Sequence, residues 1–258
     1  MFDSWYSVHA EKQWAYDTDY KSSTHPIAGE VKDTEESENI FDGITYAKGG
    51  AFLKQFYKQI SGAVFSRGLH IYFNRHKFSN TKLHDFIQAM QEACEQDAKM
   101  KNFKVWEWAK IWLQTKGINS LDYEAETDAT GTITKFTLKQ GFKKHCEPIY
   151  REQTIDIGFF DEAGHPQIFE DITVEAKEKT EVPSLVGKKL PAAVLLNMND
   201  WGYFIQDFSR KNMDYFKENV SKIKSPLTRA QIWHHVSSYG TDVLISGFEQ
   251  LNMIRNAI

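Results

Sequence analysis

The stretch Ile44–Ile60, ITYAKGGAFLKQFYKQI, sets the pattern for the first part of the chain. Its apolar side chains recur at steps of three and four residues, at Leu53, Phe56, Tyr57 and Ile60. An α-helix turns once every 3.6 residues, so this spacing places them on one helical face. The same period continues to about Gln114 and predicts a block of packed helices.

Three more helices are expected within that block. The first carries a stripe made of Phe65, Leu69, Tyr72 and Phe73. The second opens after Asn80, with Asn80 or Thr81 as its N-cap and a stripe made of Leu83, Phe86, Ile87 and Met90. The third starts near Phe103, and we expect its apolar residues to be buried on several sides: Val105, Trp106, Trp108, Ala109, Trp112 and Leu113.

An acidic connector precedes these helices. Between Gly29 and Asp42 it holds six acidic residues against a single Lys32. Like charges repel one another, and packing them together without a cation is unfavourable. The connector is therefore predicted to be a solvated loop in preference to a metal site.

From Ile118 onward the period shortens to that of β-strands. Polar and apolar residues alternate, or short apolar runs are bounded by turn residues, in Thr132–Lys139, Thr154–Phe160, Gln167–Val174, Ala192–Leu196 and Gly202–Phe208. Asp161–Gly164 and Asn197–Asp200 have the composition of turns. Several short strands with no helix between them favour a small antiparallel sandwich.

Helical spacing returns after Phe208. One stripe consists of Met213, Phe216, Val220 and Ile223. Pro226 is suited to the first turn of a following helix over Leu227–Ser238, because its missing N–H would have no partner there. A last amphipathic segment covers Asp242–Ile258.

Composition narrows the possible partners and compartments. The net charge of −4 argues against nucleic-acid binding, which needs a clustered basic surface. The two cysteines, Cys94 and Cys146, form no disulfide framework, so a reducing compartment is expected, cytoplasmic or organellar. The N-terminus does not resemble a secretory signal, and no apolar run approaches the roughly 20 residues of a membrane span. We expect a soluble protein without a membrane span.

The sequence offers no metal-ligating residues of its own. None of the nine histidines is followed directly by glutamate, so the zinc motif H-E-x-x-H is absent. His70, His76 and His84 lack the i, i+4 spacing of helical zinc ligands, and His234 and His235 are adjacent. We expect these histidines to be surface or hydrogen-bonded core residues. A nucleophile elbow and a glycine-rich phosphate loop are absent as well.

Several segments together resemble the aminopeptidase N family of zinc exopeptidases. The similar segments are Asp19–Ile27 (DYKSSTHPI), Phe41–Gly49 (FDGITYAKG), Phe65–Tyr72, Trp108–Gly117, Thr180–Gly187 and Leu195–Asp200. They occur in the family's order, and the resemblance as a whole extends from about Phe2 to beyond Arg229. In such enzymes three protein ligands hold zinc, a glutamate acts as general base, and a tyrosine hydroxyl donates a hydrogen bond to the oxyanion.

The resemblance implies that Tyr46 is that tyrosine, and it is the one catalytic residue expected here. A donor of this kind is worth ~2.7–4 kcal/mol of the activation barrier. Taken alone, a tyrosine near the start of a helix more often serves packing, and Tyr46 could persist for that reason. The family's zinc ligands and its G-x-M-E-N segment correspond to positions before Met1. No metal or other cofactor is therefore expected in this chain, and no peptidase activity from the chain alone.

The resemblance also implies an α+β multidomain fold. Residues 1–117 would be the distal helical half of a thermolysin-like catalytic domain, and residues 118–208 an antiparallel β-sandwich. Residues 209–258 would begin an α-helical C-terminal domain. We expect the first part to expose apolar surface, because the missing half of the catalytic domain would cover it.

Two functions are compatible with these expectations. The first is a non-catalytic scaffold or subunit that hides the exposed face of the N-terminal helical block against a protein partner. The alternative is one chain of a split or processed zinc aminopeptidase, in which Tyr46 stabilises the oxyanion during release of N-terminal residues. A third possibility is an incomplete record of a longer active enzyme.

Overall fold

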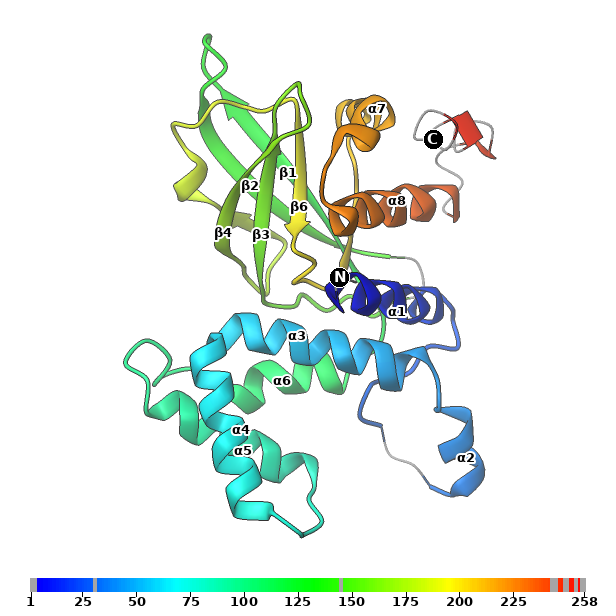
Figure 1. Cartoon of the computed structure of the whole chain (residues 1–258), viewed down its shortest axis with the longest axis vertical. Coiled ribbons are helices and arrows are strands. Elements are labelled where there is room, and N and C mark those ends of the chain that lie inside the picture. The colour runs from blue at the N-terminus through cyan, green and yellow to red at the C-terminus, as the bar shows by residue number, and fades with distance from the viewer. Residues whose placement is uncertain are drawn as a thin grey trace.

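The computed structural model describes residues 4–29, 32–143, 146–241, 246–247, 251–252 and 255. It has an α+β architecture in which helices come first, two small sheets follow, and helices close the described part. Figure 1 shows the first helices below the sheets, with α7 and α8 beside the sheets and α1 between the two regions. We call residues 4–117 the helical block and residues 118–208 the β block.

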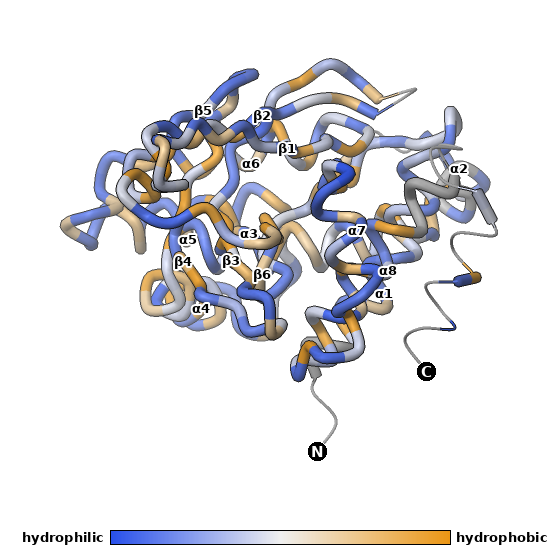
Figure 2. The backbone as a smooth tube through the Cα atoms, turned by 90° about the horizontal axis from the view of Figure 1, so that it is seen from above, coloured by the Kyte–Doolittle hydropathy of each residue, from blue (hydrophilic) through white to orange (hydrophobic). Residues whose placement is uncertain are grey.

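The helical block contains six α-helices and one π-helix among its described residues. Their bounds are α1 Ser4–Asp19, α2 Thr34–Asn39, η1 Ile44–Lys48, α3 Gly49–Ile60, α4 Gly62–His76, α5 Leu83–Glu95 and α6 Val105–Leu113. The helices predicted between Ile44 and Gln114 are thus confirmed. Hydrophobic and hydrophilic segments alternate along α1 in Figure 2.

The core of the helical block lies between α3, α4, α5 and α6. Phe56 has an exposed fraction of 0% and lies within 6.4 Å, centroid to centroid, of the rings of Phe52, Phe65, Phe86 and Trp108. Burial of such large rings contributes most of the apolar area of a core this size. The predicted stripes therefore do face the interior where their central residues lie.

Three details of the helical prediction are wrong. Five of the apolar residues predicted to face the core are 39–62% exposed, because each lies at or beyond the edge of the buried arc of its helix: Leu53, Tyr57, Phe73, Leu83 and Trp106. Helix α5 begins at Leu83 with Lys82 as N-cap, whose backbone N–H donates to the Asp85 carboxylate, so neither Asn80 nor Thr81 is the cap. The acidic connector contains the short helix α2, Thr34–Asn39, so it is not a loop throughout.

The described residues of the β block form seven strands in two sheets. The strands are β1 Asn119–Thr127, β2 Ile133–Phe142, β3 Gln153–Phe160, β4 Pro166–Val174, β5 Lys179–Glu181, β6 Ala193–Met198 and β7 Phe204–Gln206, with a 3-10 turn, η2, over Pro183–Leu185. One sheet has the order β5-β2-β1-β7 and the other β4-β3-β6. All pairs are antiparallel except β1 and β7, which run parallel with Ser120 opposite Ile205.

The parallel pair corrects the expectation of a purely antiparallel β block. Strand β7 returns to the edge of the first sheet after the chain has formed the second sheet, so its direction matches that of β1. The two sheets share one apolar core, to which both contribute residues such as Leu121, Phe136, Ile157 and Leu196. Consecutive residues of β7 face opposite ways: Phe204 joins that core, whereas Ile205 joins the core of the helical block.

Two further α-helices follow the β block between residues 209 and 241. Helix α7 spans Arg210–Asn219 and is capped by the Ser209 hydroxyl, which accepts from Asn212 N–H. A short 3-10 turn, η3 Val220–Lys222, leads to α8 at Pro226–Thr241, so the expected helix start at Pro226 is confirmed. Most of the helix predicted over Asp242–Ile258 lies outside the described residues. Within the described part of the chain, no helix has both the length and the apolar character of a membrane span.

Candidate functional site

Tyr46 lies in the middle of η1, a single turn of π-helix that follows α2 and leads directly into α3. Its side chain is 51% exposed, and its ring meets that of Phe41 edge to face at 4.7 Å between centroids. Among the described residues its hydroxyl has no hydrogen-bond partner. Single π-helical turns are rare and occur frequently at functional sites. Packing of the ring alone does not account for this placement, because half of the side chain meets solvent.

The N-terminal end of η1 is fixed by Asp42. Its carboxylate accepts hydrogen bonds from the backbone N–H groups of Ile44, at 2.8 Å, and Thr45, at 3.3 Å. Its backbone carbonyl accepts from the N–H of Tyr46 at 3.2 Å. These contacts satisfy donors that have no partner within the first helical turn.

His25 supports Asp42 from the preceding loop. Its Nε2 lies 3.1 Å from the second carboxylate oxygen of Asp42, and its Nδ1 lies 2.8 Å from the carbonyl oxygen of Pro26. Through these two contacts the imidazole ring joins the loop at Pro26 to the start of η1. Gly43 then lets η1 approach α1 closely, since a Cβ there would lie 2.7 Å from the carbonyl oxygen of Trp14.

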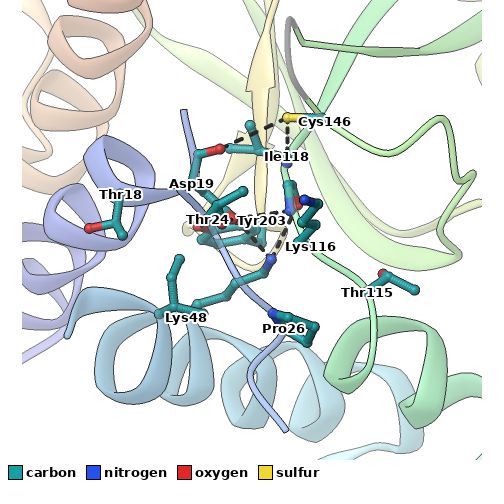
Figure 3. Close-up of polar contacts among 12 residues, drawn as sticks. Thr18, Asp19, Thr24, Pro26, Lys48, Thr115, Lys116, Ile118, Cys146 and Tyr203 are labelled. Atoms are coloured by element: carbon teal, nitrogen blue, oxygen red, sulfur yellow. Dashed lines mark hydrogen bonds and ion pairs between the residues drawn. The ribbon is translucent and has the colours of Figure 1, made fainter. Parts of the chain in front are cut away.

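The C-terminal end of η1 is fixed by a buried ion pair. Lys48 Nζ lies 2.8 Å from Asp19 Oδ2, and the two side chains are 1% and 0% exposed. Asp19 also accepts hydrogen bonds from the Tyr203 hydroxyl at 3.1 Å and from the Thr24 hydroxyl at 2.5 Å (Figure 3). The backbone N–H of Gly117 donates to the same carboxylate at 3.1 Å. Burial lowers the pKa of Lys48, and the Asp19 carboxylate opposes that change.

A second buried ion cluster lies between the helical block and the turn after β6. The side chain of Asp200 is 1% exposed. Its carboxylate oxygens lie 2.8 Å from Lys12 Nζ, 3.2 Å from His9 Nδ1 and 3.6 Å from Lys54 Nζ. Lys12 also donates to the Gly202 carbonyl at 2.5 Å. Burial alone would raise the pKa of Asp200, but the Lys12 ammonium, with His9 and Lys54, outweighs burial and holds that pKa well below its usual range.

A third ion pair joins α3 to the second sheet. Lys58 Nζ contacts Asp156 at 2.9 Å and Asp171 at 2.7 Å. Asp156 also accepts from the indole N–H of Trp201 at 2.8 Å and from the side-chain amide of Asn199 at 3.2 Å. Charged contacts therefore connect the helical block to the β block at several points, and these contacts fix their relative orientation.

The histidines do not converge on a metal site in the described part of the chain. There, no group of three or more His, Cys, Asp or Glu side chains is arranged to hold a metal ion. His70 and His84 are exposed. His235 is buried and accepts from Gln206 N–H at 3.1 Å, and burial lowers its pKa to about 3. His234 stacks on Tyr16 at 4.3 Å between ring centroids.

The sequence pointed to Tyr46 but not to the groups that hold it. Asp19, His25, Asp42 and Lys48 all lie within the two segments that resemble the aminopeptidase N family, and that was the available signal. Their spacing along the chain could not reveal two separate anchors, because Asp19 and Lys48 are brought together only by the packing of α1 against η1. The catalytic role of Tyr46 stays a prediction.

Comparisons with known proteins place these segments in context. Residues 2–115 match the model of the Peptidase family M1 domain. The chain is 36% identical over 257 residues to aminopeptidase N of Streptomyces lividans, covering 96% of this chain and 29% of that protein. It is 36% identical over 94 residues to aminopeptidase 2 of Candida albicans, covering 36% of this chain and 10% of that protein. Glutamyl aminopeptidase of Mus musculus is 32% identical over 122 residues, or 42% of this chain and 12% of that protein.

The similarity to the Streptomyces protein continues through the β block and into the last helices, although the family model ends at residue 115. The chain spans less than a third of the length of these curated relatives. It is a homologue of aminopeptidase N, and its residues 2–115 belong to the M1 peptidase family.

Proposed function

We propose that this chain supplies the tyrosine-bearing part of an M1-type zinc aminopeptidase, with Tyr46 as the hydrogen-bond donor to the oxyanion. One observation carries the proposal: Tyr46 presents a half-exposed hydroxyl, without a hydrogen-bond partner among the described residues, on a π-helical turn that is anchored at both ends. A preorganised donor stabilises charge that develops in the transition state without having to reorient. The similarity to enzymes named aminopeptidases supports release of N-terminal residues from peptides as the reaction.

The zinc that the family implies does not fit the described residues of this chain. They contain no group of side chains suited to hold it. The ligands and the general base would therefore come from polypeptide outside the described residues, either in the same protein or in a companion chain. What this chain's own residues contribute is one oriented hydroxyl and the fold that orients it.

The domain arrangement is part of the same proposal. Residues 1–117 would be the distal helical half of a thermolysin-like peptidase domain, residues 118–208 its β-sandwich domain, and residues 209–258 the start of a helical C-terminal domain. Two observations support these bounds: the strands lie between Asn119 and Gln206, and helix α7 begins at Arg210. The parallel β1–β7 pair would then be a feature of that sandwich.

A second function, that of a non-catalytic scaffold, rests on exposed apolar side chains around Tyr46. Phe41 is 69% exposed and Trp14 45% exposed, and Tyr46 lies beside Phe41. A neighbouring protein surface that covered them would gain ~25 cal/mol per Å² of apolar area buried. The zinc-bearing part of a peptidase and an unrelated protein partner would both benefit from this face, so it does not distinguish the two functions.

Changing Tyr46 to phenylalanine separates the two functions. The chain is purified with the polypeptide that carries the zinc ligands, and p-nitroaniline release from aminoacyl p-nitroanilides is followed. Loss of an oxyanion donor should lower kcat by ~10²–10³-fold. Tyr57→Phe is the matched control, because Tyr57 is a similarly exposed tyrosine on the next helix. An unchanged kcat in Tyr46→Phe, with the assembly intact, would reject the catalytic role and leave the scaffold.

A further inference from the structure

The π-helical turn that carries Tyr46 is held at its two ends by different carboxylates. Asp42 binds the backbone N–H groups at its start, and Asp19 binds the side chain of Lys48, its last residue. Tyr46 lies between these two points, two residues before Lys48. A shift of either anchor must therefore move the backbone of Tyr46.

The two anchors differ in their surroundings. The Asp42 and His25 side chains are 25% and 23% exposed, so this end is partly solvated. At the other end Lys48 and Asp19 are buried, and Lys48 also donates to the carbonyl of Gly117 at 3.2 Å. A buried ion pair adds little net stability compared with apolar packing, but it fixes geometry, since an unpaired buried charge is strongly unfavourable.

The buried anchor reaches well beyond η1. Asp19 ends α1, Gly117 precedes β1, and Tyr203 precedes β7, so one carboxylate joins three distant segments to the Lys48 ammonium (Figure 3). Arg151, in the β block, fixes the segment around Gly117, because its guanidinium donates to the carbonyl of Lys116 and to the side chain of Asn119. The position of Tyr46 thus depends on the junction between the helical block and the β block.

We infer that Lys48 with Asp19, and Asp42 with His25, are positioning residues that set the location and direction of the Tyr46 hydroxyl. The inference deepens the proposed function and rests on it for its catalytic consequence. A misplacement of about 1 Å can cost on the order of 10²-fold in rate. The hydrogen bond from the Tyr203 hydroxyl to Asp19 gives the β block a role in the same site.

The positioning role is tested first without any catalysis. The full chain is labelled with 3-fluorotyrosine, and the Tyr46 resonance is identified as the ¹⁹F signal that disappears in Tyr46→Phe. We expect Lys48→Met and Asp42→Asn each to shift or broaden this signal. Lys58→Met is the matched control, because it too removes a lysine–aspartate ion pair, but one that joins α3 to the β block and does not involve η1. The control should leave the Tyr46 signal in place.

Activity of the assembled enzyme provides the second measurement. Asp42→Asn should lower kcat by ~10–100-fold with KM within about twofold, as expected for a displaced transition-state donor. If Lys48→Met does not fold, Asp42→Asn and His25→Gln test the positioning role at the partly exposed N-terminal end of η1. An unmoved Tyr46 signal in the folded anchor variants, or an equal movement in Lys58→Met, would overturn the inference. The catalytic role of Tyr46 is tested separately: it is rejected if Tyr46→Phe leaves kcat of the assembled enzyme unchanged.

Discussion

Changing Asp200 to asparagine should lower the free energy of unfolding by about 3–5 kcal/mol at pH 7. The carboxylate is buried and faces three basic side chains, with Lys12 at 2.8 Å. Its removal leaves the Lys12 ammonium buried beside a neutral amide, and burial of a charge without its partner is the unfavourable event. Urea denaturation followed by tryptophan fluorescence measures the difference.

The control for this change is an exposed carboxylate of the same kind. Asp214 pairs with Arg210 at 3.2 Å, but the two side chains are 50% and 72% exposed. Pairs of this sort contribute between about 0 and 1 kcal/mol, so Asp214→Asn should have little effect. If the two variants were equally stable, the Asp200 cluster would have to be hydrated or rearranged. A buried ion cluster would then not hold the helical block against the β block at this point.

The pH dependence of the Asp200 effect follows from the direction of its pKa. Because the folded state holds that pKa well below the ordinary value of about 3.9, the carboxylate stabilises the fold fully above about pH 4. Its contribution is lost as the pH falls below that value towards the folded-state pKa. The difference between wild type and Asp200→Asn should therefore shrink on acidification. A difference that stays constant from pH 7 to pH 3 would contradict the charged pairing.

A separate acid effect involves the buried histidines and occurs at higher pH. Burial lowers the pKa of His235 to about 3, so the unfolded chain takes up a proton below about pH 6.5 when the folded chain does not. Both proteins should lose stability over that range. Comparing the two stability curves at each pH, in place of their absolute slopes, removes the acid effect that the two proteins share.

Much of the helical block could be predicted from its sequence because its stripes are local. Phe56, Ile60, Ile87 and Met90 are buried as their spacing indicates. Which apolar residues lie at the edge of the buried face is harder to predict, as Trp106 illustrates. It is apolar, but α6 buries only one side, and residue type alone does not say where that side ends.

The β block was predictable in content but less so in pairing. The alternation in β2 and β3 indicates strands, whereas β1, with the sequence NSLDYEAET, is too polar for its individual limits to be predicted. That β1 lies parallel to β7 depends on residues about 85 positions apart, and no local signal encodes that pairing. Long-range partners are set by the packing of the whole sheet.

The anchors of the candidate site belong to the same class of long-range contacts. Lys12 and Asp200 are separated by 188 positions, and a lysine in a helix is expected to be solvated unless a partner is known. Tyr46 itself was found only because its neighbours resemble a family in which that tyrosine has a role. Residue patterns alone would have assigned it to packing, which its exposure does not support.

Changing Phe56 to alanine should lower the free energy of unfolding by about 3–5 kcal/mol, since it removes a fully buried ring from the aromatic centre of the helical block. Phe73→Ala is the control, because Phe73 is 62% exposed and truncation there should change stability by less than about 0.5 kcal/mol. The more informative result concerns the β block, which lies on the other side of the proposed boundary near residue 117.

We expect Phe56→Ala to weaken both blocks together. The core that contains Phe56 also includes Tyr203 and Ile205 from the β block, and the Lys12–Asp200 and Lys58–Asp156 pairs cross the same boundary. Hydrogen exchange at the β3 amides should therefore speed up by the factor that the loss of global stability requires. Protection of β3 that stays unchanged would show that the two blocks unfold independently. In that case the β block could not hold Tyr46 in place through Tyr203 and Asp19.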